Sequence, residues 1–316
     1  MNKNTLEKIF LPEDTSIDSY AFSGYEALEE IDLPNVTSIG NRAFYGCAAL
    51  VSIKLPKVKS IGDYAFGNCI ALVEITLLYV EKIGFYAFTG CAALVSINLP
   101  KVYLIDSHTF YGCVALKEIN LPEVIFIEDN AFIDCIALEE IILPKVTFFS
   151  SSVFINCIAL KKIILPKVTS IATYACNDFR ALVEIDLPNV TYIGPYAFNG
   201  CIALTYICLP KVKSIGSYAF RGCSNNLNIE LHLSEDEQEN GQIKLNTNIF
   251  PLVSTIIIHN NCELEITRSE EEQNINIIID FGYVINLKYN GELIEDLNVI
   301  TDSNVNIYIT PGYIFK

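Results

Sequence analysis

Cysteine is the residue whose abundance in this chain most readily supports chemistry, since 11 of the 316 residues are cysteines. A metal or redox site would need clustered C-x-x-C pairs, and the sequence contains none. Most of the cysteines recur instead at one position of a 22-residue period: Cys47, Cys69, Cys91, Cys113, Cys135, Cys157, Cys201 and Cys223. This spacing favours a buried column of reduced thiols over metal or redox chemistry, because a buried thiol behaves as a small hydrophobic side chain. Unbridged thiols in an odd total also suit a reducing compartment.

Other groups that carry catalysis or bind metals are sparse. The three histidines, His108, His232 and His259, are far apart in sequence, and the motifs of serine hydrolases, P-loop proteins and zinc proteases are missing. The segment from Asp236 to Thr247 faintly resembles a calcium-binding loop, but its twelfth position is threonine instead of glutamate, so a polar loop is favoured. We therefore predict no catalytic residue, no metal ligand and no cofactor.

The elements that must position these residues belong to one repeat. The phrase L-E-E-I-D-L-P-N-V-T-S-I-G-N-R-A-F-Y-G-C-A-A-L runs from Leu28 to Leu50, and related phrases follow every 22 residues. A fixed period of roughly 20–50 residues indicates a solenoid or a similar array. Ten units begin at Leu6, Leu28, Leu50, Leu72, Leu94, Leu116, Leu138, Leu160, Leu182 and Leu204. A solenoid offers a long binding surface and seldom a catalytic cleft.

Each unit begins with a short strand. Polar and apolar residues alternate from Glu30 to Leu33, which predicts a half-buried strand, and Pro34 ends it because proline cannot donate to a sheet ladder. One unit cannot bury its own apolar edges, so the units must stack with their strands parallel. We expect strands centred on Ile9, Ile31, Ile53, Ile75, Ile97, Ile119, Ile141, Ile163, Ile185 and Ile207.

The rest of the unit returns the chain to the next strand. Gly40 is expected at a turn where a positive φ is needed. The segment that carries Ala43, Phe44 and Cys47 is expected to form a short helical or 3-10 turn.

The phrase L-x-x-I-x-L-P-x-V-x-x-I-G-x-x-A-F-x-G-C-x-x-L resembles the BspA-like type of leucine-rich repeat (LRR) over about residues 6–226. The resemblance implies a leucine-rich-repeat solenoid with a parallel β-sheet face. Members of that family are surface proteins of bacteria and of large protozoan families, linked to adhesion and to binding of host or partner proteins. The resemblance implies no binding residue, because the motif positions are core positions.

We predict two regions: an LRR solenoid over residues 1–226 and a β-rich region over residues 227–316. Leu227 to Leu231 is expected to be an eleventh strand. Further runs rich in β-branched residues predict strands at 255–258, 263–266, 276–279, 284–287 and 304–309. These strands would form a cap, continued coils or a small β domain.

The net charge of −16 is concentrated near the C-terminus, where residues 227–316 hold 15 acidic and 4 basic residues. A basic stripe for a phosphate backbone is missing, so we expect no nucleic-acid partner. The sequence contains no run of about 18 apolar residues, so it predicts no transmembrane helix. The first ten residues lack an apolar signal segment, which favours a cytoplasmic protein. The family resemblance instead implies a cell-surface or secreted protein from which a leader has been removed.

The leading functional hypothesis is a non-enzymatic scaffold for protein–protein interaction or adhesion, which binds a host, matrix or other partner protein through positions that vary between units. One alternative is a self-assembling structural protein, that is, a homo-oligomer. A remote alternative is a carbohydrate-active or other enzyme, which would need an acidic column on the strand face; the outward strand positions show no such column.

The central units carry the candidate partner-binding patch. The position of Ser38 is small and polar in most units, but three consecutive units have Leu104, Phe126 and Phe148 there, preceded in two of them by Tyr103 and Ile125. Stacking would merge these side chains into one apolar patch. Alternatively, the turn tilts them into the core, or the C-terminal region covers them.

Two further features accompany this patch. The position of Gly40 is occupied in the same stretch by Asp106, Glu128, Ser150 and Ala172. Ile142 and Ile164 form a second apolar pair on the strand face, for the same contact or another one.

Overall fold

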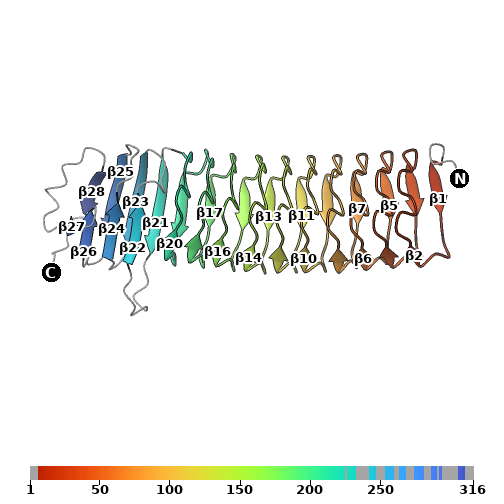
Figure 1. Cartoon of the computed structure of the whole chain (residues 1–316), viewed down its shortest axis with the longest axis horizontal. Coiled ribbons are helices and arrows are strands. Elements are labelled where there is room, and N and C mark those ends of the chain that lie inside the picture. Colours follow the sequence, from red (N-terminus) through yellow and green to blue (C-terminus); the bar gives the residue numbers. More distant parts are fainter. Residues whose placement is uncertain are drawn as a thin grey trace. The chain divides into compact units, whose positions relative to one another are not determined.

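The computed structural model describes residues 6–224, 226–232, 242–246, 253–259, 263–267, 274–280, 286–289, 292–293 and 305–309. The chain divides into two compact units, residues 1–165 and residues 166–316, which are described in turn. Both consist of short strands joined by turns, and the described residues include no helix (Figure 1).

The predicted strand of each repeat is present throughout the first unit, once per 22 residues. These strands are β1 (Lys8–Phe10), β3 (Glu30–Asp32), β5 (Ser52–Lys54), β7 (Glu74–Thr76), β9 (Ser96–Asn98), β11 (Glu118–Asn120), β13 (Glu140–Ile142) and β15 (Lys162–Ile164). Strands β1 to β11 form one parallel sheet, in which Ile31 pairs with Ile9 on one side and Ile53 on the other. β13 and β15 pair in the same way. The predicted parallel stack centred on isoleucines is therefore confirmed.

A second row of strands, which the sequence analysis did not predict, follows the first in every coil. Its members are β2 (Ser16–Ile17), β4 (Ser38–Ile39), β6 (Ser60–Ile61), β8 (Lys82–Ile83), β10 (Leu104–Ile105), β12 (Phe126–Ile127) and β14 (Phe148–Phe149). They pair in parallel as β2-β4-β6-β8 and as β10-β12-β14. The second residue of each strand is buried, so each strand contributes one core side chain.

The return segment is a run of tight turns, so the predicted helical or 3-10 turn was wrong. Alternate amides bond in two directions: Ala43 N donates to Gly40 O within the coil, whereas Arg42 N and Phe44 N donate to carbonyls of the next coil, at 2.8 Å each. Arg42 also has φ 54° and Gly46 has φ 73°. A continuous helix needs right-handed residues and amides that donate to carbonyls of the same segment, so the left-handed residues and the amides that donate to the next coil exclude it.

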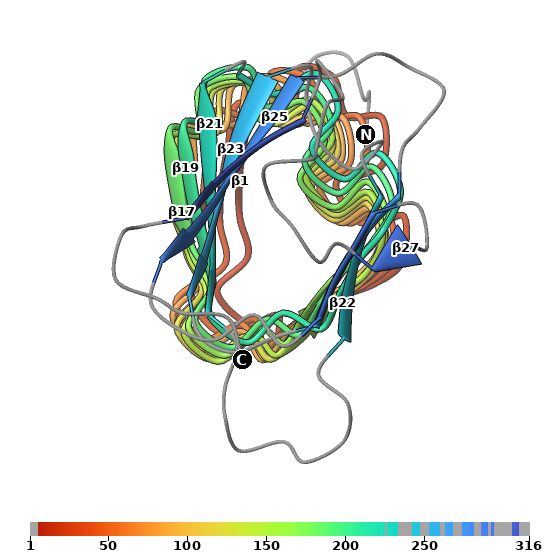
Figure 2. The same ribbon diagram turned by 90° about the vertical axis from the view of Figure 1, so that its left-hand side faces the viewer.

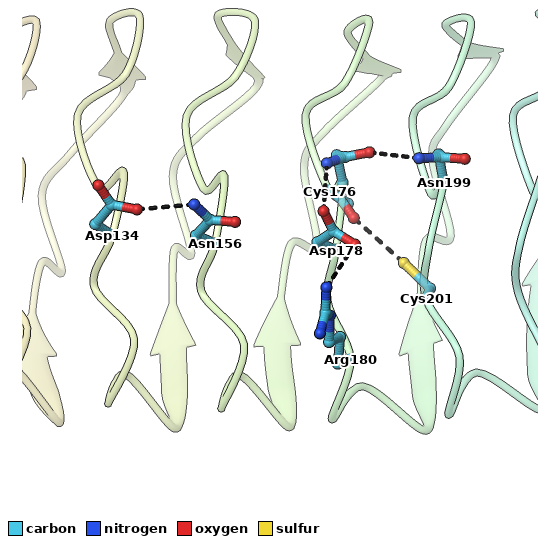
Figure 3. Close-up of polar contacts among 8 residues, drawn as sticks. Asp134, Asn156, Cys176, Asp178, Arg180, Asn199 and Cys201 are labelled. Carbon is cyan, nitrogen blue, oxygen red and sulfur yellow. Dashed lines mark hydrogen bonds and ion pairs between the residues drawn. The ribbon is translucent and has the colours of Figure 1, made fainter.

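Gly40 lacks the predicted positive φ, and its glycine has a different cause. A Cβ at this position would lie 2.5 Å from Ser19 N in the preceding coil, so the close approach of two backbones excludes a side chain in this coil. The left-handed residues lie further along the turn. One such column holds Gly46 and its equivalents, which are all glycine, asparagine or aspartate, including Asp134 and Asn156, joined at 2.8 Å (Figure 3).

The core of the first unit consists of columns of identical side chains. Phe44 stacks on Phe66 with ring centroids 5.3 Å apart and planes within 5° of parallel, and the same stack runs from Phe22 to Phe154. Beside it, the thiols lie in a second column, where Cys69 Sγ donates to Phe44 O at 3.1 Å. All the predicted column cysteines are buried and reduced, as expected.

The second unit repeats this arrangement and extends it with longer strands. They are β16 (Ser170–Ile171), β17 (Glu184–Asp186), β18 (Tyr192–Ile193), β19 (Tyr206–Leu209), β20 (Ser214–Ile215), β21 (Leu227–His232), β22 (Gln242–Asn246), β23 (Val253–His259), β24 (Glu263–Thr267), β25 (Asn274–Asp280), β26 (Asn286–Tyr289), β27 (Glu292–Leu293) and β28 (Val305–Ile309). Strands β17, β19, β21, β23, β25 and β28 follow one another in one parallel sheet.

The predicted eleventh strand is confirmed as β21, which pairs in parallel with β19. On the other side of the coils, β22, β24 and β26 are parallel and β27 is antiparallel to β26 (Figure 2). The boundary between residues 226 and 227 stays a prediction, and the predicted polar loop at 234–241 lies outside the described residues.

One coil of the second unit exchanges the residues of the phenylalanine and cysteine columns. Cys176 occupies the phenylalanine position and Phe179 occupies the cysteine position, yet both are fully buried. Cys201 Sγ donates to Cys176 O at 3.2 Å, as other column thiols do to the phenylalanine carbonyl (Figure 3). The exchange keeps the total side-chain volume of this coil unchanged.

Candidate protein-binding surface

The predicted apolar patch lies on the outer face of the sheet β10-β12-β14. Leu104 pairs in register with Phe126, and Phe126 with Phe148, whose rings stack with centroids 5.8 Å apart. Tyr103 and Ile125 lie in the adjacent column, where Ile125 N donates a hydrogen bond to Tyr103 O at 2.9 Å. We call these five residues the apolar row.

The apolar row lies at the surface of the first unit. Ile125 is 52% exposed, Tyr103 43% and Phe148 40%, while Leu104 and Phe126 are half-buried. The core positions of the same strands are filled by other residues: Ile105, Ile127 and Phe149. The alternative in which the turn tilts the row into the core is therefore wrong, because the strands place neighbouring side chains on opposite faces.

Ile142 and Ile164 do not belong to the apolar row. They pair with each other in β13 and β15, whereas the row lies on the second set of strands. Ile142 is exposed and borders a shallow groove of about 450 Å³, whose other lining residues are Lys117, Glu118, Ile119, Asn120, Glu139 and Glu140. This surface is mostly charged, so the two isoleucines form a smaller and separate feature.

An acidic border runs along one side of the apolar row. Asp106 and Glu128 each lie one residue beyond the end of a strand, β10 and β12 respectively, and both are half-buried. Burial raises the pKa of Asp106, and the negative charges of Glu128 and Asp63 raise it further. We call Asp63, Asp106, Glu128 and Asp129 the acidic border; among the described residues, none of them forms an ion pair.

His108 is half-buried at the position that tyrosine occupies in most coils. Its ring stacks on Tyr86 with centroids 4.4 Å apart, and its Nδ1 has no hydrogen-bond partner. Burial lowers the pKa of His108, while Asp129 opposes that shift. The other two histidines, His232 and His259, are register partners in β21 and β23 despite their distance in sequence. The described side chains include no group of three that could hold a metal ion.

A second apolar surface was missed by the sequence analysis. It consists of exposed valine and isoleucine side chains that precede the three-residue strands of the first row, either in the turn or directly before the strand. These residues are Val51, Ile70, Val73, Val95, Val114, Ile136 and Ile158. We call it the turn stripe. The recurrence of valine and isoleucine at these variable positions of the repeat was the available signal. No described helix is long or apolar enough to cross a bilayer.

The chain matches the model of a family of repeat proteins. The model of the BspA type leucine rich repeat region matches in six copies, over residues 1–103, 59–182 and 147–260. A search of curated proteins finds no match.

Several solved structures are similar to this chain. A leucine rich cell surface protein from Faecalibacterium prausnitzii is 24% identical, with a TM-score of 0.52 and 90% of this chain and 88% of that chain covered. A leucine rich repeat protein from T. pallidum is 30% identical, with a TM-score of 0.36 and coverage of 43% and 79%. A leucine-rich repeat protein from Bacteroides ovatus is 26% identical, with a TM-score of 0.33 and coverage of 71% and 86%.

Proposed function

Because this chain belongs to the BspA-type leucine-rich repeat family, we propose that it is a non-enzymatic scaffold that binds a partner protein through its apolar row. Repeats of this family generally serve protein interaction. The observation that carries the proposal is that a position with a small polar residue in most coils holds Leu104, Phe126 and Phe148 in three consecutive coils, where Phe148 is exposed and the other two are half-buried. The same position holds serine in most other coils, as in Ser38, Ser60 and Ser170, and it holds Lys82 and Tyr192 in the other two.

The apolar row is a better candidate than the turn stripe for a specific interface. The turn stripe extends over many coils and contains only valine and isoleucine, as expected of a feature of the repeat itself. The apolar row is confined to three coils and includes Tyr103, Phe126 and Phe148. Aromatic side chains are enriched among the few residues that dominate binding energy. Three neighbouring coils span only about 10 Å, so the row would be the centre of a larger contact.

We further propose that the partner is a protein outside the cell, such as a host or matrix protein, and that binding supports adhesion. The similarity to a leucine rich cell surface protein supports this part of the proposal. Homo-oligomer formation through the same surface is an alternative outcome of the test below.

The test compares two triple variants, each of which changes one column of apolar residues over three consecutive coils. One carries Leu104→Ser, Phe126→Ser and Phe148→Ser; its control carries Val114→Ser, Ile136→Ser and Ile158→Ser in the turn stripe, where the exposed fractions are 38–41%. Circular dichroism establishes that each variant is folded. Captured proteins from native lysate and surface extracts are then compared by mass spectrometry, and self-association is followed by light scattering.

We expect the apolar-row variant to lose a partner that the wild type and the control variant retain. Retention of every partner by a folded apolar-row variant would end the proposal. If that variant unfolds, the single variant Ile125→Ser decides, because half of this side chain is already exposed and its loss should not affect the core.

A further inference from the structure

The charges around the apolar row are arranged asymmetrically. On one side lies the acidic border, in which half-buried Asp106 and Glu128 follow Leu104 and Phe126 by two residues, just beyond the ends of β10 and β12. No lysine or arginine of the described residues lies within ion-pair distance of these carboxylates. The edge of the row that carries Asp106 and Glu128 is therefore negatively charged, and no ion pair among the described residues neutralises it.

The other side of the row carries Lys101, Glu123 and Lys145, which together have a net charge of +1. Lys145 Nζ lies 2.6 Å from Glu123 Oε2, and Lys101 Nζ lies 4.7 Å from the centre of the Tyr79 ring. At the end of the row, Lys82 occupies the position equivalent to Leu104, and Glu81 precedes it. These lysines therefore lie at one end of the row and on the side opposite the acidic border, and one of them, Lys145, is in an ion pair.

An uncompensated acidic edge beside an apolar surface restricts what binds there. Docked groups lose water, and like charges placed opposite the border would oppose binding strongly. A second copy of this chain would bring further negative charge, since its net charge is −16. A partner with lysine or arginine along one edge would neutralise the border and would also be steered towards it.

From these contacts we propose that the occupant of the apolar row is a basic amphipathic segment of another protein. Its apolar side chains would rest on Phe126, Ile125 and Phe148, and its lysine or arginine side chains would face Asp106 and Glu128. This inference rests on the proposed function and adds the chemical class of the partner.

The probe is a fluorescently labelled synthetic peptide of about twelve residues, with leucines on one face and lysines along its edge. Its control peptide carries glutamate at every lysine position. Binding is measured by fluorescence anisotropy to the full chain and to two double variants that change net charge equally. The first, Asp106→Asn with Glu128→Gln, removes charge from the acidic border; the second, Asp32→Asn with Glu74→Gln, removes it from the sheet of β3 and β7.

We expect the lysine peptide to bind and the glutamate peptide not to bind. The acidic-border variant should weaken binding about fivefold or more, consistent with two partly exposed charge pairs. The Asp32/Glu74 variant should bind almost as well as the wild type. Raising the ionic strength from about 0.1 M to about 1 M should weaken wild-type binding and remove most of the difference between the variants.

Two results would overturn the inference. Equal weakening by both double variants would mean that net charge, not the acidic border, attracts the peptide. Equal binding of the lysine and glutamate peptides would mean that the partner is not selected for basic groups.

The matched pair Ile125→Ser and Ile70→Ser separates this inference from the proposed function, since these isoleucines are 52% and 53% exposed on different surfaces. If peptide binding depends on Ile125 but not on the acidic border, the binding surface stands and only the partner chemistry fails. If binding of neither peptide depends on Ile125, the inference is overturned and the capture experiment alone decides the proposed function.

Discussion

Asp106 shows how a single residue can oppose stability at a surface. It occupies the position that is glycine in several other coils, and its carboxyl is partly buried beside Glu128 and Asp63. Burial and these two negative charges raise its pKa above the ordinary value of 3.8. Residues that cost stability are often retained for binding, which is the role that the further inference gives to Asp106.

Replacement of Asp106 by asparagine is expected to stabilise the protein at neutral pH. The raised pKa means that the folded chain holds the proton more tightly than the unfolded chain, so the ionised form costs stability once the pH rises through that pKa. Asp106→Asn should raise Tm by about 1–2 °C at pH 7 and change little near pH 3, where the carboxyl is neutral in both states. Thermal unfolding at several pH values measures this, and an equal gain at both pH values would contradict the cause.

The turn is the element in which local preference and stacking are opposed. Tyr64, Tyr86 and Tyr174 have φ between 54° and 58°, a conformation that costs non-glycine residues roughly 1–2 kcal/mol each. Stacking offsets part of that cost, since the Tyr64 and Tyr86 rings lie 4.6 Å apart and parallel within 1°. Aromatic pairs contribute roughly 0.5–1.5 kcal/mol. The aromatic column therefore stabilises a backbone that isolated turns would avoid.

The exchanged pair Cys176 and Phe179 predicts non-additive energetics within one turn. Cys176→Phe alone should overpack the core by about 1–3 kcal/mol, and Phe179→Cys alone should leave a void that costs about 2–5 kcal/mol. The double variant restores the common order of the repeat and should lie within about 1 kcal/mol of the wild type. Denaturant unfolding of the four proteins measures the coupling; additive single effects would show that the two sites do not share one volume.

At the scale of the whole molecule, the thiol columns make chemical reactivity a measure of global order. All the column cysteines and Cys176 are buried, and burial raises the pKa of Cys91 to about 12. Cys208 is the half-exposed member of the ten described cysteines. Because each coil contacts only its neighbours, exposure of a thiol requires local opening of the stack.

A thiol titration of the Cys262→Ser variant tests whether the buried thiols react only when the stack opens. Near pH 8 the native protein should react at about one site, Cys208, and slowly, because burial and Glu230 raise the pKa of this thiol. The other nine should react only in denaturant. A Cys208→Ser, Cys262→Ser double variant should then be silent in its native state, whereas rapid reaction of most thiols would show that the column is open.

Much of this architecture was determined by the sequence alone. The 22-residue period placed Ile31, Leu33, Phe44 and Cys47 in the core and placed the first strand of each coil, because stacked copies must present the same face. It also brought Leu104, Phe126 and Phe148 together, since side chains one period apart become neighbours. The function of this surface stays a proposal.

Only the tertiary structure decided the remaining features. Strands such as Ser38–Ile39 are too short for alternation to be detected. The left-handed turn at Arg42 arises because its amide bonds to the next coil, and the glycine at position 40 arises from contact with the previous one. The isolation of the acidic border and the separation of Ile142 from the apolar row also depend on which surface each strand occupies. These properties belong to contacts between coils, and no single unit of the sequence contains them.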